Sequence, residues 1–289
     1  MENLSSLTQD ILKWLTYINL YCRRMDLKTY CSDFDSIIYE YDSLTSTQTE
    51  AKRLALTGIQ KAIVVTKEQT HGKGRCGRNW ESPQEGGLYV SFLINPIIHP
   101  SEIHLISFTA GLAVASHLRD TYGIGAALKW PNDVIIPEDN TISGNGRAFS
   151  FKKICGILSE ASISPEEVKY CIVGIGINCK KQTIPTELLS RACALDEYVR
   201  NIDFRKLLID ISNEFFNRVK SFEIEGKRKL LQEYVSFCST IGKTIQIETG
   251  DEVIKGIATG IEESGELLVE TVNGVVKFSS ADVLHAAIQ

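Results

Sequence analysis

The feature that constrains the fold most is the alternation of strand-like and helix-like segments through the middle of the chain. Short runs rich in β-branched and aromatic residues predict strands, and apolar residues repeating every three to four positions predict helices. The predicted strands cover residues 36–41, 62–67, 88–94, 127–130, 134–136, 154–161 and 170–178. The predicted helices cover residues 50–56, 102–122, 204–222 and 227–237. This order indicates an α+β domain built around a mixed sheet.

Two helix starts are predicted from local signals. Thr47 and Glu50 have the spacing of a capping box, in which two side chains hydrogen-bond each other's backbone N–H at a helix N-terminus. Near the beginning of the chain, apolar residues at helical spacing predict a short helix over residues 7–24. We therefore expect an N-terminal helical extension over residues 1–35, too short for a full helix-turn-helix module.

The pattern changes after Cys238. Residues 242–285 predict four short strands separated by turn sequences at 249–251, 263–265 and 273–274. The last turn is Asn-Gly, which is a strong hairpin signal between apolar runs. We expect a small SH3-like β-barrel over residues 239–289, appended to a larger domain over residues 36–238.

Composition narrows the classes of function. The chain of 289 residues carries a formal net charge of −5, which argues against a broad polyanion-binding surface but not against a local basic loop. No apolar stretch approaches the roughly 20 residues that a membrane span requires. The first residues lack the basic and apolar pattern of a targeting peptide. We expect a cytoplasmic globular protein.

Cysteine and histidine spacing argues against a metal site held by protein side chains alone. None of the 8 cysteines stands in a C-x-x-C pair, and the 5 histidines form no ligand-spaced pair. Cysteines within apolar strand-like runs are typical of free thiols that pack as small hydrophobic residues. Ser/His/Asp hydrolysis also lacks support, because the sequence has no G-x-S-x-G motif.

The most unusual segment is residues 69–80, QTHGKGRCGRNW. It contains three glycines, the cations Lys73, Arg75 and Arg78, and no acidic residue. Glycine allows backbone N–H groups to approach an anion closely, and the cations supply charge at the same place. The segment therefore predicts either a phosphate-binding loop or an exposed polar loop, and composition alone does not separate the two.

Two nucleotide-binding motifs are excluded. The glycines of this segment match the spacing of the dinucleotide fingerprint, but the residues that follow do not predict the helix that the fingerprint needs. Gly242-Lys243-Thr244 resembles the end of a P-loop, yet Phe237 stands where its first glycine belongs.

Three further segments are candidates for chemistry, and each has a structural alternative. Residues 129–133, KWPND, favour a hairpin turn when taken alone. Residues 152–158, KKICGIL, place two lysines before an apolar strand, where a lysine is either a solvated strand end or a charge that meets a phosphate. Residues 173–178, VGIGIN, leave room for a flat ligand or for a closely packed helix, and Asn178 both donates and accepts hydrogen bonds.

The order of these segments is more informative than any one of them. Ser46-Thr47-Gln48, the glycine-rich segment, KWPND, KKICGIL, GIGIN and a small β-rich tail follow one another as in the biotin protein ligases, which the chain resembles over residues 36–285. The resemblance implies the fold of the biotin/lipoate ligases. It also implies ATP-dependent formation of biotinyl-5′-AMP and transfer of biotin to one lysine of a carboxylase's biotin carrier domain.

The resemblance also implies roles for individual residues. Neutral side chains around Ser46 would bind the ureido group, the loop from Gly72 would close over the carboxylate and phosphates, and Trp80 would stack near adenine. Lys153 would bridge the biotin carboxylate and the α-phosphate, and Asn178 would read the adenine edge. The implied binding residues are Ser46, Thr47, Gln48, Gln69, Gly72, Lys73, Gly74, Arg75, Arg78, Trp80, Lys129, Asn132, Lys153, Gly156 and Asn178. The implied catalytic residues are Lys153, Arg75 and Asp133.

The implied reaction explains why cations are needed. The first step brings a carboxylate against a polyphosphate, and cations with Mg²⁺ would offset the repulsion between these anions. A glycine-rich loop that orders on ligand binding would then protect the acyl-adenylate from water. The second step needs a neutral amine, whereas a lysine is almost fully ionised at neutral pH. Asp133 is our candidate for the group that deprotonates or desolvates it.

The sequence departs from the family in two places. The family loop usually reads GRGRRGR, whereas Lys73 and Cys76 replace two arginines here. Lys73 lacks the bidentate fork and Cys76 lacks the charge, so we expect weaker retention of the adenylate. Residues 137–151 form an extra polar stretch that we expect to be a mobile loop.

Two alternative functions stay open at this point. One is a lipoate–protein ligase, and the other is a biotin-responsive DNA-binding repressor. We expect a monofunctional biotin ligase whose partner is a biotin carrier domain, with no nucleic-acid or membrane partner. The oligomeric state is open, and a homodimer is one alternative.

Overall fold

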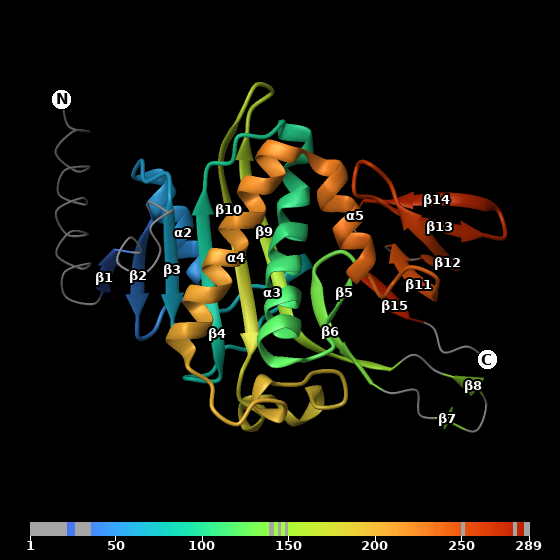
Figure 1. The fold of residues 1–289 in the computed structure, drawn as a ribbon, viewed down its shortest axis with the longest axis horizontal. Coiled ribbons are helices and arrows are strands. Elements are labelled where there is room, and N and C mark those ends of the chain that lie inside the picture. The colour runs from blue at the N-terminus through green and yellow to red at the C-terminus, as the bar shows by residue number, and fades with distance from the viewer. Residues whose placement is uncertain are drawn as a thin grey trace.

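A computed structural model of the chain describes residues 22–26, 36–138, 142–143, 146–147, 150–249, 252–279 and 282–285. Its largest element is an eight-stranded mixed sheet with the strand order β1-β2-β3-β4-β10-β9-β6-β5 (Figure 1). β2 and β3 are parallel, and the other neighbours are antiparallel. The strands are β1 (Cys22–Asp26), β2 (Ile37–Tyr41), β3 (Ala62–Thr66), β4 (Gly87–Ile94), β5 (Ala127–Lys129), β6 (Asp133–Pro137), β9 (Phe151–Ile163) and β10 (Val168–Asn178). The predicted α+β fold with a mixed sheet is confirmed.

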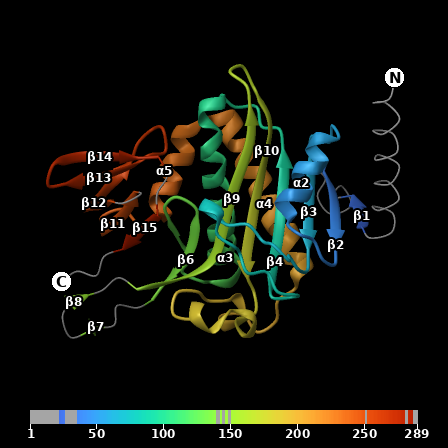
Figure 2. The same ribbon diagram turned by 180° about the vertical axis from the view of Figure 1, so that it is seen from behind.

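Helices cover both faces of this sheet. α3 (Ile106–Tyr122), α4 (Phe204–Glu225) and α5 (Lys227–Phe237) lie on the face seen in Figure 1. α2 (Thr47–Leu56) and the loop between β3 and β4 lie on the opposite face, seen in Figure 2. The structure also describes short 3-10 helices: η2 (Arg75–Gly77), η3 (Pro100–Leu105), η4 (Lys181–Thr183), η5 (Thr186–Leu188) and η6 (Leu195–Glu197).

The sheet therefore has two hydrophobic cores, and β3 shows how the sequence produces them. All five residues of β3 are buried. Ile63 and Val65 belong to the large core with α3 and α4, whereas Ala62 and Val64 belong to the smaller core under α2. Because successive side chains of a strand point to opposite faces, a strand that is covered on both sides reads as a continuous apolar run.

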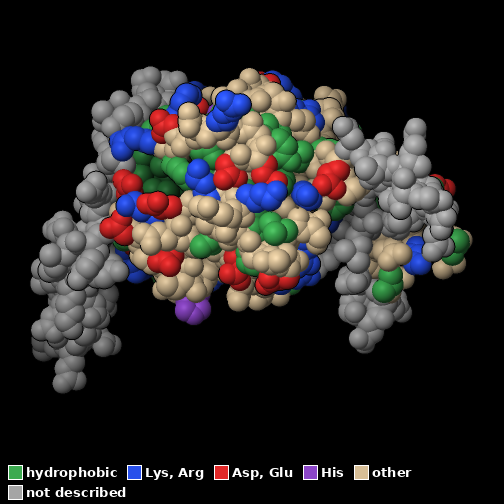
Figure 3. Space-filling view, turned by 90° about the horizontal axis from the view of Figure 1, so that it is seen from below, with side chains coloured by type: hydrophobic (Ala, Val, Ile, Leu, Met, Phe, Trp, Pro, Cys, Tyr) green, Lys and Arg blue, Asp and Glu red, His purple; other side chains and the backbone are tan. Residues whose placement is uncertain are grey.

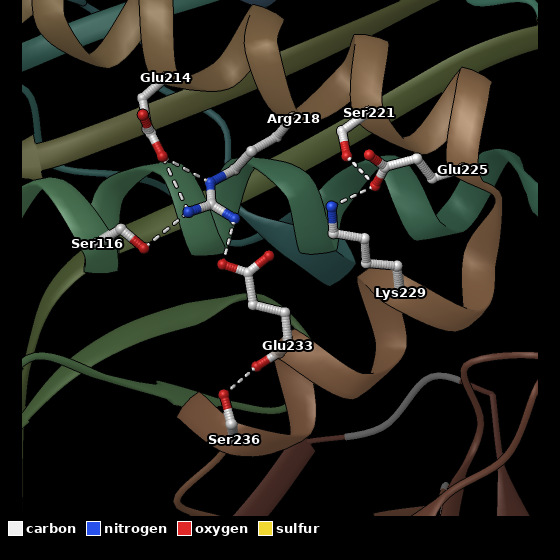
Figure 4. Close-up of polar contacts among 8 residues, drawn as sticks. All are labelled: Ser116, Glu214, Arg218, Ser221, Glu225, Lys229, Glu233 and Ser236. Carbon is white, nitrogen blue, oxygen red and sulfur yellow. Dashed lines mark hydrogen bonds and ion pairs between the residues drawn. The ribbon is translucent and has the colours of Figure 1, made fainter.

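An ion-pair cluster joins the three helices of the large core (Figure 4). Arg218 of α4 lies 2.9 Å from Glu214 and 2.7 Å from Glu233 of α5, and it donates a hydrogen bond of 2.8 Å to Ser116 of α3. The guanidinium side chain is only 14% exposed, and these acceptors compensate for its loss of water. The cluster fixes the helices relative to one another behind the sheet.

The C-terminal part forms a separate five-stranded antiparallel sheet with the order β14-β13-β12-β11-β15. Its strands are β11 (Thr244–Thr249), β12 (Glu252–Ile261), β13 (Leu267–Thr271), β14 (Gly274–Phe278) and β15 (Asp282–His285). The predicted small SH3-like barrel is confirmed. β15 is a fifth strand, which the sequence pattern did not predict as an element of its own. Gly274, the glycine of the predicted Asn-Gly turn, has φ 110° and is the first residue of β14.

The C-terminal barrel contacts the KWPND turn directly. Trp130 is 1% exposed, its ring N–H donates to the backbone oxygen of Gly265 at 3.1 Å, and its backbone N–H donates to Thr240 Oγ1 at 3.1 Å. The His104 ring also hydrogen-bonds the backbone oxygen of Ser264. The predicted hairpin at KWPND is present between β5 and β6, and the Trp130–Pro131 peptide bond is cis.

The predicted capping box is wrong. α2 begins at Thr47, three residues earlier than expected, with Ser46 as its N-cap and no side-chain cap. The Glu50 side chain does not accept a hydrogen bond from the backbone at the helix start. Its carboxylate instead accepts hydrogen bonds from Tyr41 Oη at 2.6 Å and Arg53 Nε at 2.8 Å. Thr47 is likewise engaged by other elements, as described below.

Three other predictions change in detail or lie partly outside the described residues. The expected helix at 7–24 lies outside them up to residue 21, and residues 22–24 belong to β1. The helix expected at 102–122 starts as the 3-10 helix η3. Much of the stretch 137–151 is also outside the described residues; within it, β7 (Ile142–Ser143) pairs with β8 (Gly146–Arg147).

The surface carries charges of both signs. On the face drawn in Figure 3, basic and acidic side chains are interspersed over the described atoms. None of the helices in the described ranges is long and apolar enough to cross a membrane.

Candidate functional site

A small cavity of about 60 Å³ lies on the α2 face of the sheet. It is enclosed by the N-terminus of α2, the glycine-rich loop, β9 and β10, which are far apart in the sequence. Its lining includes eleven of the predicted binding residues: Ser46, Thr47, Gln48, Gln69, Lys73, Gly74, Arg75, Trp80, Asn132, Lys153 and Gly156. The structure thus brings together segments that the sequence suggested only by their order.

The floor of the cavity is made by glycines of β9 and β10. Gly156 and Gly176 are paired across the two strands, and the Trp80 indole lies on them. A Cβ atom on Gly176 would lie 2.5 Å from Trp80 Nε1, and one on Gly156 would lie 2.8 Å from Trp80 Cζ3. Both positions therefore require glycine. The glycines of the GIGIN segment leave room for a flat group, and in this structure that group is the indole ring of Trp80.

A chain of hydrogen bonds fixes the polar end of the cavity. Ser91 Oγ donates to Thr47 Oγ1 at 2.7 Å, and both the backbone N–H and the hydroxyl of Thr47 donate to Gln69 Oε1, at 2.9 and 3.2 Å. Gln69 Nε2 donates to Ser82 Oγ at 2.7 Å. The amide of Gln69 thereby has a fixed orientation, which prepares the site to discriminate donors from acceptors on a ligand.

Three buried polar atoms at this cavity have no hydrogen-bond partner in the described structure: Ser46 Oγ, Gln48 Oε1 and Trp80 Nε1. Buried polar atoms are rarely left without a partner, so atoms of this kind point to a missing ligand. All three groups are neutral. They suit a neutral ligand group that carries both donors and acceptors.

Two cations lie at the other end of the cavity, and adjacent residues of the KWPND turn hold them. Lys153 Nζ lies 2.6 Å from the Asp133 carboxylate and 5.1 Å from the centre of the Trp80 ring. Arg75 Nη1 donates to Asn132 Oδ1 at 3.0 Å, while Asn132 Nδ2 donates to the backbone oxygen of Ile157 at 2.7 Å. The cavity is therefore neutral at one end and cationic at the other.

The glycine-rich loop is a tight hairpin. The N–H of Trp80 donates to the Gly72 oxygen at 2.9 Å, and the N–H of Gly74 donates to the Arg78 oxygen at 2.7 Å. Its tip contains Cys76 at φ 54° and Gly77 at φ 72°. Cys76 is exposed and occupies a backbone conformation that favours glycine. The hairpin places its cations between two cavities.

The second cavity, of about 730 Å³, lies on the other side of this hairpin. It extends along β9 to the N-terminus of α3 and to the barrel residues Gly265 and Ser279. Gly72 and Arg78 line it, and Arg75 and Asn132 line both cavities. The two cavities therefore meet at the cationic end of the smaller one.

Three predicted site residues line neither cavity. Asp133 forms an ion pair with Lys153, which itself lines the small cavity. Asn178 donates to the backbone oxygen of Cys193 at 3.2 Å. Lys129 is largely buried, with Nζ 5.0 Å from the centre of the Phe151 ring, and burial lowers its pKa below the ordinary 10.5.

Sequence reasoning missed four residues at the site. Ser91 and Ser82 complete the hydrogen-bond chain, Tyr89 lines the small cavity, and Glu160 lines the large one. Ser91 could have been found from the sequence, because it is the one serine in the otherwise apolar run of β4. Its side chain is 0% exposed. Glu160 lies at a strand position that the sequence pattern did not distinguish.

The described residues contain no cluster of three or more His, Cys, Asp or Glu side chains that could hold a metal ion. Burial raises the pKa of the Cys171 and Cys179 thiols to about 12, so they stay protonated at neutral pH. No cysteine is among the described residues that line the small cavity, whose polar groups are cations, amides and hydroxyls.

Comparison with known proteins agrees with this geometry. The sequence matches the Biotin/lipoate A/B protein ligase family over residues 40–178 and the Biotin protein ligase C terminal domain over residues 240–285. The bifunctional ligase/repressor BirA of Bacillus subtilis (strain 168) is 32% identical over 251 residues, which cover 86% of this chain and 73% of that protein. The biotin–[acetyl-CoA-carboxylase] ligase of Paracoccus denitrificans is 28% identical over 82% of this chain and 96% of its own length.

Solved structures give the same result. The biotin protein ligase from Aquifex aeolicus in complex with biotin and ATP superposes with a TM-score of 0.69 and is 29% identical, covering 86% of this chain and 99% of its own. The sequence matches, the order of the motifs and the shared architecture agree, and the chain belongs to the biotin protein ligase family.

Proposed function

We propose that this chain activates biotin with ATP to biotinyl-5′-AMP and transfers the biotin to a lysine of a carboxylase's biotin carrier domain. One observation carries the proposal: Arg75 and Lys153 meet at one end of a cavity whose other end holds unpartnered neutral groups. This polarity matches biotin, which has a neutral ureido ring at one end and a carboxylate at the other. The Aquifex aeolicus relative was solved with biotin and ATP.

The neutral end would bind the ureido group. Ser46 Oγ and Gln48 Oε1 lack partners, and the Gln69 amide is held in one orientation by Thr47 and Ser82. A ureido group offers two N–H donors and a carbonyl acceptor, which these groups satisfy without any net charge. Trp80 lies on the floor of the cavity and would supply a flat apolar wall to a ligand. Its stacking near adenine, which the resemblance implies, stays a prediction.

The cationic end would carry out the first step. A biotin carboxylate oxygen attacks the α-phosphorus of ATP, a new P–O bond forms, and the bond to the β-phosphate breaks so that pyrophosphate leaves. Both reactants are anions, and Lys153 and Arg75 would offset their repulsion and stabilise the charge that develops on the α-phosphate. Asn132 and Asp133 would hold these cations in place before the ligands arrive.

Mg²⁺ would accompany ATP rather than occupy a site made by the protein alone. Mg²⁺ is commonly held by one or two carboxylates together with substrate phosphates. Asp133 supplies a carboxylate at the cationic end, and it fits this limited role. The ion would neutralise phosphate charge when bound.

The second step would use the same centre. The neutral amine of the carrier lysine attacks the carbonyl carbon of the adenylate, a C–N bond forms, the bond to the phosphate oxygen breaks, and AMP leaves. We retain Asp133 as the candidate base, since it lies 2.6 Å from Lys153 at this centre. Lys129, at the end of β5, and Asn178, at the end of β10, would contribute to nucleotide binding as the resemblance implies.

The domain division, the partners and the compartment follow from this function as further proposals. Residues 36–238 would bind biotin and ATP, 239–289 would form the appended barrel, and 1–35 would be an extension. A carboxylase carrier domain would be the protein partner, as the name of the Paracoccus denitrificans relative indicates for that enzyme. The six described free cysteines and the use of ATP suit a reducing cytoplasm.

The proposal is tested by incubating the protein with ATP and either biotin or lipoate and measuring pyrophosphate release. We expect release with biotin, followed by labelling of an added biotin carrier domain. Pyrophosphate release with lipoate but not with biotin would show that lipoate is the substrate. Biotin-dependent binding to duplex DNA without labelling of any carrier would instead favour a repressor.

A further inference from the structure

The larger cavity follows an open edge of β9. β6 pairs with β9 from Phe151 to Gly156, and β9 continues to Ile163. Four consecutive residues of this continuation, 157–160, line the cavity. Successive residues of a strand point to opposite faces, so a cavity that touches all four runs along the strand edge rather than over one face.

This edge leads to the cationic end of the small cavity. Arg75, Asn132, Ile157 and Leu158 line both cavities. With about 730 Å³, the larger cavity is wide enough for a long side chain, whereas the smaller one has about 60 Å³. A side chain that enters along β9 therefore arrives where the adenylate would form.

Charged side chains are unevenly distributed along the larger cavity. Lys73, Arg75 and Arg78 line the larger cavity, and Glu160 is the one carboxylate among the described residues that line either cavity. Glu160 is half-buried and forms no hydrogen bond or ion pair with another described residue. It pairs with Ile172 of β10, which belongs to the small core under α2, so the Glu160 side chain lies on the same face of the sheet as the small cavity. A carboxylate at this place attracts a cationic group.

We propose that Glu160 binds the ammonium group of the acceptor lysine as it enters the larger cavity. An ammonium group has three donors and a positive charge, which suits a carboxylate. The lysine must pass three cations, and Glu160 offsets their repulsion. The inference rests on the proposed function, because it concerns the second substrate of that reaction.

The test separates the two half-reactions of a Glu160→Gln variant. We expect unchanged biotin-dependent pyrophosphate release, and kcat/KM for the apo biotin carrier domain about tenfold lower in single-turnover transfer from preformed adenylate. Glu166→Gln, in the exposed turn between β9 and β10, is the matched control and should transfer at the wild-type rate.

A small neutral nucleophile provides the decisive comparison. Hydroxylamine is uncharged at neutral pH, so wild type and Glu160→Gln should release biotin to it at equal rates. The inference would be overturned if Glu160→Gln transferred biotin to the carrier at the wild-type rate. It would also be overturned if the variant lost the same fraction of its rate with hydroxylamine as with the carrier. Failure of the wild-type protein to release pyrophosphate would instead contradict the proposed function, which keeps the two outcomes distinguishable.

Discussion

The ammonium group of Lys153 lies 2.6 Å from the carboxylate of Asp133 and thereby joins β9 to the KWPND turn at the cationic end of the cavity. The preceding residue, Asn132, accepts a hydrogen bond from Arg75. Two successive residues of one turn thus hold two cations that come from separate segments. This arrangement explains why the motif has both an amide and a carboxylate at these positions.

Removal of Lys153 tests the cationic end. Lys153→Ala should reduce biotin-dependent pyrophosphate release by about 100- to 1000-fold, because a preorganised donor to the developing charge is lost. The side chain is 30% exposed, so the fold should be retained. Lys152→Ala is the matched control, since Lys152 pairs with Glu138 and should leave the rate unchanged. A near-normal rate for Lys153→Ala would remove this residue from the mechanism.

A double-mutant cycle tests the link between Arg75 and Asn132. Arg75→Gly should release the adenylate early and label lysines of an added bystander protein such as serum albumin. Asn132→Ala should produce a smaller effect in the same direction, because Asn132 holds the guanidinium. The double variant should label no more than Arg75→Gly, since the two residues act as one unit. Additive labelling would contradict this coupling.

Ser91→Ala tests the hydrogen-bond chain at the neutral end. The hydroxyl is completely buried, and its loss leaves Thr47 Oγ1 without its donor. We expect a loss of about 1–2 kcal/mol in the free energy of unfolding in urea titrations, together with weaker biotin binding by calorimetry. Ser236→Ala, at an exposed hydroxyl of α5, should change neither quantity. Unaltered biotin affinity in Ser91→Ala would show that the chain is purely structural.

Gly176→Ala tests the floor of the cavity. Its Cβ atom would lie 2.5 Å from Trp80 Nε1, so the indole must shift. Overpacking of this kind costs about 1–3 kcal/mol, and we expect a lower melting temperature and a loss of biotin binding. Gly125→Ala has no neighbouring atom within 4 Å and should behave as wild type. Normal biotin affinity in Gly176→Ala would contradict the position of Trp80.

His117 predicts a pH dependence of stability away from the site. It is 7% exposed, its Nε2 has no partner in the described structure, and burial lowers its pKa below 6.5. The facing charges are Asp120, Asp210, Glu214 and Lys206. Below pH 6.5 the unfolded chain binds a proton that the folded chain binds only at lower pH, so acid reduces stability in that window.

The variant His117→Phe lacks this titration and should keep the ring packed against Tyr122, which lies at 5.3 Å between ring centres. We expect its urea midpoint to change less than that of wild type between pH 7 and pH 5.5. Equal changes in the two proteins would show that His117 makes no contribution.

The sequence predicted the elements of the fold well where periodicity was strong. Five elements lie close to their expected ranges: β3, β4, β10, α4 and α5. Each buries apolar residues in a regular pattern that can be read from the sequence. The start of α2 was predicted wrongly, because Glu50 is satisfied by Tyr41 and Arg53 rather than by the helix start. A local motif cannot reveal partners that come from another strand.

The same reasoning explains what was missed at the site. Motif order identified Arg75, Lys153 and Asn132, since each stands in a conspicuous segment. Glu160 and Ser82 have no motif of their own, and only the folded chain places them beside the cavities. Asn178 was expected to read adenine, and in this structure its amide donates to Cys193. Its role toward the nucleotide stays a prediction.

A crystal structure determined after soaking with biotin and ATP tests the account most directly. We predict one biotinyl-5′-AMP molecule whose ureido ring contacts Ser46 and Gln48 and whose phosphate lies within hydrogen-bond distance of both Arg75 and Lys153. An adenylate bound elsewhere, or a phosphate that touches neither cation, would contradict the claim that these two side chains allow the two anions to react.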